Sequence, residues 1–339
     1  MVCHYAFCAA VSDKLARRVL YMKIRFWGVR GSIPTPLTEE TLREKLQKAM
    51  RLATPADLAS EASIERFIDS LPVSVRAVYG GNTTCLEVRT ADDEILVIDC
   101  GTGIKNLSKE LMKGDFGKGR GIGNIFLTHT HWDHIQGIPF FAPFYVKGNR
   151  FNIYSPFGDI RERVEYQQVF THFPVNLDYM FATKEFFILE KESPFYLNNI
   201  KITNKRMRHP GGCFGYRFDE NGKSFVFTSD CEFNIDEIDS IDTYRDFFLD
   251  ADVLVFDAQY TFEEAIDKID WGHSSASIAI DIALRFNVKR LFLWHHEPDY
   301  SDEKLEVVLS NAKTYMAMNA KRRRFLEIDI AREGMEIEL

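Results

Sequence analysis

The sequence predicts an α/β fold built as one domain, and three observations support this prediction. Short apolar runs broken by glycine or proline recur along the chain, as is typical of β-strands. Residues 271–287 instead repeat apolar side chains at helical spacing. The 28 phenylalanines indicate thick apolar layers such as facing sheets, although ordinary core packing explains them equally well. No repeat or linker interrupts the chain, so we expect a single domain over residues 22–339 with an N-terminal extension at 1–21.

The first part of the chain combines strands with one segment of different character. Residues 22–28 are an expected strand that leads into a rigid loop at 29–36, which contains Gly31 and two prolines. Residues 38–72 are charged and have helical spacing, so we expect a helical insertion there, either a lid or surface decoration. The other elements expected in this part are strands at 85–89, 94–99 and 124–127 and a helix at 104–112.

Strands dominate the rest of the chain. A helix is expected at 271–287, where Ser274 or Ser275 can cap its N-terminus, and a second helix at 303–318. The expected strands lie at 151–155, 186–189, 200–204, 214–218, 224–228, 253–256, 290–294 and 325–330.

Composition limits the classes of function. A formal net charge of -8 disfavours nucleic acid as a partner, since nucleic-acid binding usually draws on a basic face, and a small anionic substrate fits better. The six cysteines form no CxxC pair, which predicts reduced thiols and a cytoplasmic location. No stretch approaches the roughly 18 apolar residues of a membrane span, so no membrane partner is expected.

Three imidazoles and a carboxylate follow directly after the apolar run 124–127, at His129, His131, Asp133 and His134. Histidines two apart on an extended segment project the same way, so His129 and His131 can share one ion. Asp133 and His134 can then point toward another. The alternative is a histidine cluster without metal, which would need a hydrogen-bonding partner for every desolvated ring. The pattern therefore predicts a site for two divalent ions.

Further ligand candidates lie downstream, where apolar strands end beside turns. They are His209, Asp230 and His295, and a carboxylate at Asp230 could bridge both ions. Taken singly, each could equally have a core or supporting role. Asp99 ends an apolar strand before a glycine turn, and there we expect a buried hydrogen-bond anchor rather than a ligand.

The segment His129-Thr130-His131-Trp132-Asp133-His134 resembles the HxHxDH signature of the metallo-β-lactamase superfamily, and the order of the later candidates fits as well. The resemblance implies a four-layer αββα sandwich with the site at one edge of the two sheets. It assigns one metal to His129, His131 and His209, the other to Asp133, His134 and His295, and a bridging role to Asp230. His296 is the alternative to His295, because neighbouring residues on an extended strand face opposite sides.

Within this superfamily the chain resembles the phosphodiesterase branch that contains ribonuclease Z and the phosphonate-pathway phosphodiesterase. Trp271-Gly272-His273-Ser274-Ser275 is similar to the branch's His-Ser-Thr motif, and Asp257 falls where ribonuclease Z has a glutamate that orients this histidine. Residues 27–35 also resemble the branch's glycine-rich N-terminal motif. His273 and Asp257 are thereby implied as catalytic residues. The alternative for His273 is a histidine that stands at a helix N-terminus by chance.

The expected chemistry is hydrolysis by two divalent ions. They would lower the pKa of a shared water enough to leave a bridging hydroxide at neutral pH. Asp133 can orient that hydroxide, and His273 can donate a proton to the leaving alkoxide. Zinc is the favoured metal, with manganese and iron as alternatives, because the ligands are imidazoles and carboxylates without thiolate.

We therefore expect a dinuclear metal-dependent hydrolase, and specifically a phosphodiesterase for a small or cyclic phosphodiester. Ribonuclease Z docks tRNA with a protruding, basic, glycine- and proline-rich arm, and the sequence contains no such segment. The missing arm disfavours tRNA processing, so a tRNA 3′-end endonuclease is kept only as an alternative. Another is a thioesterase or other carbonyl hydrolase. A non-catalytic nucleotide-binding protein is disfavoured by the nearly full ligand set. The branch resemblance also implies a homodimer.

Overall fold

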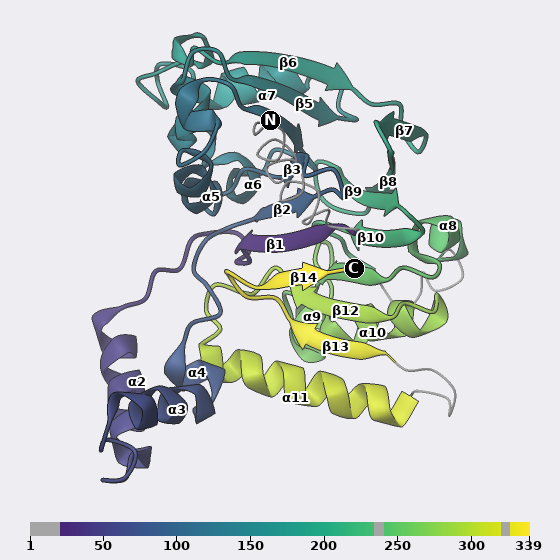
Figure 1. The fold of residues 1–339 in the computed structure, drawn as a ribbon. Helices are drawn as coiled ribbons and strands as arrows, with labels where there is room; N and C mark the ends of the chain where they lie inside the picture. The colour runs from purple at the N-terminus through teal and green to yellow at the C-terminus, as the bar shows by residue number, and fades with distance from the viewer. Residues whose placement is uncertain (1–20, 234–240, 320–325) are drawn as a thin grey trace, which may run out of the picture.

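Two seven-stranded sheets form the centre of the molecule, in a computed structural model that describes residues 21–233, 241–319 and 326–339 (Figure 1). The first sheet runs β14-β1-β2-β3-β4-β5-β6 and the second β13-β12-β11-β10-β9-β8-β7. The first sheet is antiparallel from β14 to β3 and parallel from β3 to β6, and the second is antiparallel from β7 to β10 and parallel from β10 to β13. The strands are β1 Lys23–Gly28, β2 Cys85–Arg89, β3 Ile95–Ile98, β4 Ile122–Phe126, β5 Arg150–Ser155, β6 Thr183–Ile188, β7 Pro194–Leu197, β8 Ile200–Met207, β9 Cys213–Glu220, β10 Lys223–Phe227, β11 Val253–Asp257, β12 Arg290–Trp294, β13 Glu327–Ile330 and β14 Glu336–Glu338.

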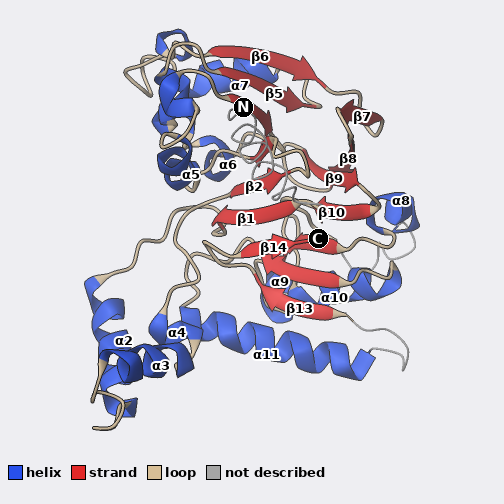
Figure 2. Ribbon diagram, in the orientation of Figure 1, coloured by secondary structure: helices blue, strands red, loops and turns tan. Residues whose placement is uncertain are grey.

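Helices cover the outer faces of both sheets (Figure 2). Helices α5 and α7 pack against the first sheet, and α10 and α11 against the second. The described α-helices are α2 Glu39–Leu52, α3 Glu61–Ser70, α4 Val73–Arg76, α5 Ile104–Leu111, α6 Trp132–Ile135, α7 Ile160–Gln167, α8 Arg245–Phe248, α9 Phe262–Asp267, α10 Ala276–Arg285 and α11 Asp302–Asn319. The expected αββα sandwich is confirmed.

Aromatic side chains fill the space between the sheets. Phe126 from the first sheet meets Tyr216 from the second edge to face, with ring centroids 5.5 Å apart, and Phe227 packs against Trp294 at 4.8 Å. These side chains are fully buried and alternate along their strands with residues on the outer faces. Part of the phenylalanine content therefore serves the facing sheets, whereas other rings, such as Phe151 and Phe248, pack in the clusters under the helices.

One expected helix begins later than its sequence pattern suggested. Helix α10 starts at Ala276 rather than at Trp271, and residues 271–275 form a loop. Gly272 has a φ of +92°, which a helix does not allow. Ser275 occupies the N-cap position, as one of the two predicted alternatives, but its side chain makes no capping bond, and the Ser274 hydroxyl donates to the Cys231 carbonyl instead.

Residues 38–72 are helical, as the sequence predicts, and α2 and α3 project away from the two sheets (Figure 1). Thr38 caps α2 and Ser60 caps α3. Whether this segment is an insertion into one domain remains a prediction. The expected N-terminal extension lies outside the described residues except for position 21. Among the described residues, no helix is long and apolar enough to cross a membrane.

Candidate metal centre

The candidate site lies where strands of both sheets end. The histidine cluster follows β4, His209 follows β8, Asp230 follows β10 and His295 follows β12. Parallel strands place their carboxyl ends at one edge of a sheet, so the loops after β4, β10 and β12 bring residues far apart in sequence together. A cavity of about 370 Å³ opens at this edge.

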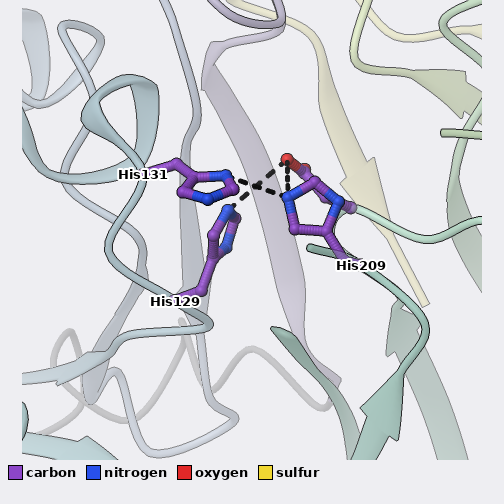
Figure 3. A group of neighbouring side chains, drawn as sticks. His129, His131 and His209 are labelled. Atoms are coloured by element: carbon purple, nitrogen blue, oxygen red, sulfur yellow. Dashed lines mark hydrogen bonds and ion pairs between the residues drawn. The ribbon is translucent and has the colours of Figure 1, made fainter. Parts of the chain in front are cut away.

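Three imidazoles and one carboxylate form the first cluster. His129, His131 and His209 turn toward one another in Figure 3, and Nε2 of His209 lies 2.9 Å from Nδ1 of His131. Asp230 Oδ2 lies 3.5 Å from His129 Nε2 and 3.7 Å from His209 Nε2. One ligand atom from each of the four residues falls within 4.8 Å of all the others, which is the spacing that a shared metal ion requires.

A second cluster shares Asp230 with the first. Nε2 of His295 lies 3.1 Å from Asp133 Oδ2 and 3.3 Å from Asp230 Oδ1. His134 contributes its Nε2, 3.2 Å from Asp230 Oδ2. Because Asp230 reaches one cluster with Oδ2 and the other with both oxygens, it has the position of a bridging carboxylate.

The opposite ring nitrogen of each buried histidine is held by a neighbouring group. Nδ1 of His134 lies 2.7 Å from Asp99 Oδ2, and Nδ1 of His209 lies 2.9 Å from the Gly272 carbonyl. Nδ1 of His129 faces the Thr128 hydroxyl at 3.1 Å. Donation from Nδ1 leaves the Nε2 lone pairs directed at Asp230. Asp99 thus has the anchoring role expected of it.

Buried polar atoms test whether these residues fit a cation. Nε2 of His129, Nε2 of His134 and Oδ1 of Asp230 are inaccessible to solvent and make no hydrogen bond. Burial lowers the pKa of His129 well below its usual value, so its imidazole is neutral and keeps a lone pair. Burial alone would also lower the pKa of His134, but the carboxylates of Asp230, Asp133 and Asp99 raise it well above its usual value, so the negative charge around this ring favours a bound cation. Both observations fit a divalent metal.

Comparison with known proteins agrees with this geometry. The family model described as the beta-lactamase superfamily domain matches residues 95–296. The chain belongs to the beta-lactamase superfamily. A ribonuclease Z of Picrophilus torridus is 25% identical over 294 residues, which cover 73% of this chain and 90% of that protein.

Two solved structures share the superfamily fold at lower identity. The metallo-beta-lactamase fold protein YhfI from Bacillus subtilis has 18% identity and a TM-score of 0.61, with 94% of this chain and 99% of that chain covered. The short form of human tRNase Z has 18% identity and a TM-score of 0.55, with 93% and 98% covered. The expected resemblance to the branch that contains ribonuclease Z is confirmed.

In this member of the superfamily, the two histidines after β12 point in different directions. His295 has a positive φ of 64°, which turns its ring into the second cluster. The ring of His296 is buried on the other side, where Nε2 donates to the Ala331 carbonyl at 2.7 Å. The geometry thus supports His295 as the candidate ligand.

His273 and Asp257 form a pair beside the clusters. Nδ1 of His273 lies 2.8 Å from Asp257 Oδ2, and its ring stacks on that of His295 with centroids 4.8 Å apart. Burial alone would lower the pKa of His273, but the Asp257 carboxylate raises it to about 9. His273 also lines the cavity, and a pKa of about 9 favours its protonated form at neutral pH beside the space for a ligand.

Sequence reasoning missed two contacts of the site. The backbone N–H of Ser32 donates to Asp133 Oδ2 at 2.9 Å, and Gln259 Oε1 lies 2.9 Å from Nδ1 of His295. The rigid loop predicted at 29–36 was the one feature of the sequence that could have indicated the contact of Ser32 with the site. A Cβ on Gly31 would lie 2.6 Å from the His295 ring, so only glycine allows the loop to approach this closely.

Proposed function

We propose that this protein is a dinuclear metal-dependent phosphodiesterase that hydrolyses a small phosphodiester. The observation that carries the proposal is the convergence of two ligand clusters on Asp230, with the His273–Asp257 pair beside them. Metal clusters alone would suit many hydrolases. A protonated histidine that faces the same cavity adds a proton donor for an alkoxide leaving group, and phosphodiester hydrolysis needs one.

The residues that would hold the metal ions are the members of the two clusters. His129, His131 and His209 would bind one ion, and Asp133, His134 and His295 the other, with Asp230 between them. Zinc suits these imidazoles and carboxylates best, and manganese and iron are the alternatives. When bound, the ions supply a water of lowered pKa and neutralise charge on the phosphate oxygens.

The chain's own residues would orient the reaction. Hydrolysis joins a water oxygen to phosphorus, breaks the bond from phosphorus to the leaving oxygen, and leaves that oxygen in need of one proton. His273 would donate this proton from Nε2, since Asp257 holds Nδ1. Asp133 would accept a hydrogen bond from the attacking water, and the Ser32 N–H fixes the orientation of this carboxylate.

A small substrate is favoured by charge. The protein has a formal net charge of -8, and the residues that line the cavity include neither lysine nor arginine in the described part of the chain. A long polyanion would therefore find few cationic partners. A tRNA 3′-end endonuclease is the second candidate, because curated relatives such as that of Picrophilus torridus are named ribonuclease Z.

Substrate assays on the purified, metal-loaded protein test the proposal. We expect turnover of bis(p-nitrophenyl) phosphate with added zinc or manganese, loss of turnover on chelation, and no turnover by the Asp230→Asn variant. A thioester, a lactam and a precursor tRNA are the competing substrates. Thioester turnover without phosphodiester turnover would overturn the proposal, and efficient cleavage of precursor tRNA alone would favour the second candidate.

A further inference from the structure

Trp132 stands at the rim of the metal cavity with its side chain 81% exposed. It is the first residue of α6, between the buried cluster residue Asp133 and the cluster residue His131. The Gln136 N–H donates to the Trp132 carbonyl at 2.7 Å, so the backbone that carries the indole is held by the same short helix as the cluster. A large apolar ring is thus presented to solvent beside the reacting centre, where burial against a ligand would be favourable.

The other three tryptophans each have a partner within the protein. The Trp27 indole donates to Glu87, Trp294 packs against Phe227, and Lys268 lies over the Trp271 ring. The indole of Trp132 has no such partner among the described residues, in either an aromatic ring or a cation. This ring is therefore available to stack on a ligand.

The cavity suits a ligand with one phosphate and a flat apolar group. Its volume of about 370 Å³ lies in the range of pockets for whole small molecules rather than for a bare phosphate. Two metal ions would neutralise one phosphodiester charge, but a second phosphate would meet no lysine or arginine among the described residues that line the cavity. Apart from cluster residues and His273, only Trp132 offers a broad ring there.

We propose that Trp132 determines specificity by stacking on a flat aromatic ring that the substrate carries beside its phosphodiester, as a nucleobase does in a nucleoside phosphodiester. The inference rests on the proposed phosphodiesterase function and names its substrate class. Stacking of one base on an aromatic side chain contributes about ten-fold or more to binding.

Two esters with the same leaving group isolate this contribution. Methyl p-nitrophenyl phosphate and thymidine 5′-(p-nitrophenyl phosphate) differ only in the group that remains on phosphorus. The wild-type protein should prefer the thymidine ester in kcat/KM, and Trp132→Ala should lower the ratio of the two kcat/KM values about ten-fold. Trp132→Phe should keep most of the ratio. Tyr196→Ala is the control, since Tyr196 is 64% exposed on the edge strand β7, away from the cavity.

An equal loss for both esters in Trp132→Ala, or a wild-type ratio near one, would overturn the inference while leaving the phosphodiesterase function intact. Failure of the proposed function would instead show as no turnover of either ester. If neither ester is hydrolysed, calorimetry still tests the stacking role by measuring how tightly the metal-loaded proteins bind thymidine 5′-monophosphate. About ten-fold weaker binding by Trp132→Ala, with unchanged metal content, supports the stacking role, and equal binding overturns it.

Discussion

Gln259 holds His295 in one ring orientation. The side-chain nitrogen of Gln259 donates to Glu297 Oε2 at 2.6 Å, so its Oε1 is the atom that faces Nδ1 of His295 at 2.9 Å. An amide oxygen only accepts, and His295 must therefore donate from Nδ1. Its Nε2 lone pair is then directed toward Asp133 and Asp230, as a metal ligand requires.

Removal of this acceptor should weaken metal binding. In Gln259→Leu the His295 ring loses its hydrogen-bond partner, and we expect the affinity for one of two metal ions to fall by about 10- to 100-fold. Calorimetric titration of the chelated protein with zinc measures both affinities. Far-ultraviolet circular dichroism should show an unchanged fold. Two unaltered affinities in the variant would show that Gln259 does not position His295.

The same site shows how far the sequence could be interpreted. The spacing of His129, His131 and Asp133 is local, and side-chain types that bind metals are recognisable without a structure. Ser32 acts through a backbone N–H, which any residue possesses, and Gln259 is a common polar residue 36 positions before His295. Contacts of this kind depend on how distant loops meet, and no local pattern encodes them.

The fold could be predicted in its layers but less well at the ends of its elements. Alternating and continuous apolar runs indicated most strands, whereas the short edge strands β7 and β14 carry too few residues to show a period. The α10 boundary was wrong because the helix was extended back to Trp271, although residues 272–275 carry no apolar repeat and Gly272 has a positive φ that a helix does not allow. The carbonyl of Gly272 instead contacts His209, so the site determines that boundary.

Metal binding should stabilise the protein. The buried nitrogens of His129 and His134 have no hydrogen bond, and a ligand that binds only the folded state raises its melting temperature. We expect zinc added to the chelated protein to raise the melting temperature by about 5 °C or more at saturating concentration. Two ions should bind per chain, measured by elemental analysis. Asp230→Asn should lose this response and Asp257→Asn should keep it; a response unchanged in Asp230→Asn would refute the bridging assignment.

The pH dependence of hydrolysis should depend on the leaving group. The raised pKa of His273, about 9, keeps its imidazolium present at neutral pH and removes it as the pH rises through that value. For an alkyl leaving group, which needs the proton, kcat should therefore fall above about pH 9. A p-nitrophenyl leaving group needs no proton and should show a weaker decline. Asp257→Asn removes the carboxylate that raises this pKa, so its decline for the alkyl ester should begin at lower pH. Identical pH profiles for the alkyl and the p-nitrophenyl ester would exclude His273 as the acid.

His296 should make stability sensitive to mild acid. Burial lowers the pKa of His296 to about 3, whereas an unfolded histidine titrates near 6.5. The unfolded chain therefore binds the proton first, and stability falls as the pH drops below about 6.5. Between pH 6.5 and 5 this contribution is about 2 kcal/mol. Urea unfolding should show a smaller loss over this range in His296→Gln than in the wild type. The exposed His172→Gln is the control, and equal losses in all three proteins would contradict the assignment.

Lys45 should hold the helical segment 38–72 to the body of the protein. It is the only buried residue of α2, and its ammonium lies 2.6 Å from the buried Asp302 carboxylate, at the start of α11, and 2.9 Å from the Ala77 carbonyl. Lys45→Ala would remove the positive charge that pairs with this buried carboxylate. We therefore expect the free energy of unfolding to fall by about 3 kcal/mol.

Lys48 provides the matched control, because it pairs with Glu303 on the same two helices but both side chains are 43% exposed. Exposed pairs contribute little, so Lys48→Ala should cost less than about 1 kcal/mol. Limited proteolysis adds a local measurement: the segment between α2 and α3 should be cut faster in Lys45→Ala than in Lys48→Ala, because α2 separates from α11 without global unfolding. Equal proteolysis and equal stability loss in the two variants would mean that apolar packing, rather than the buried ion pair, holds the segment in place.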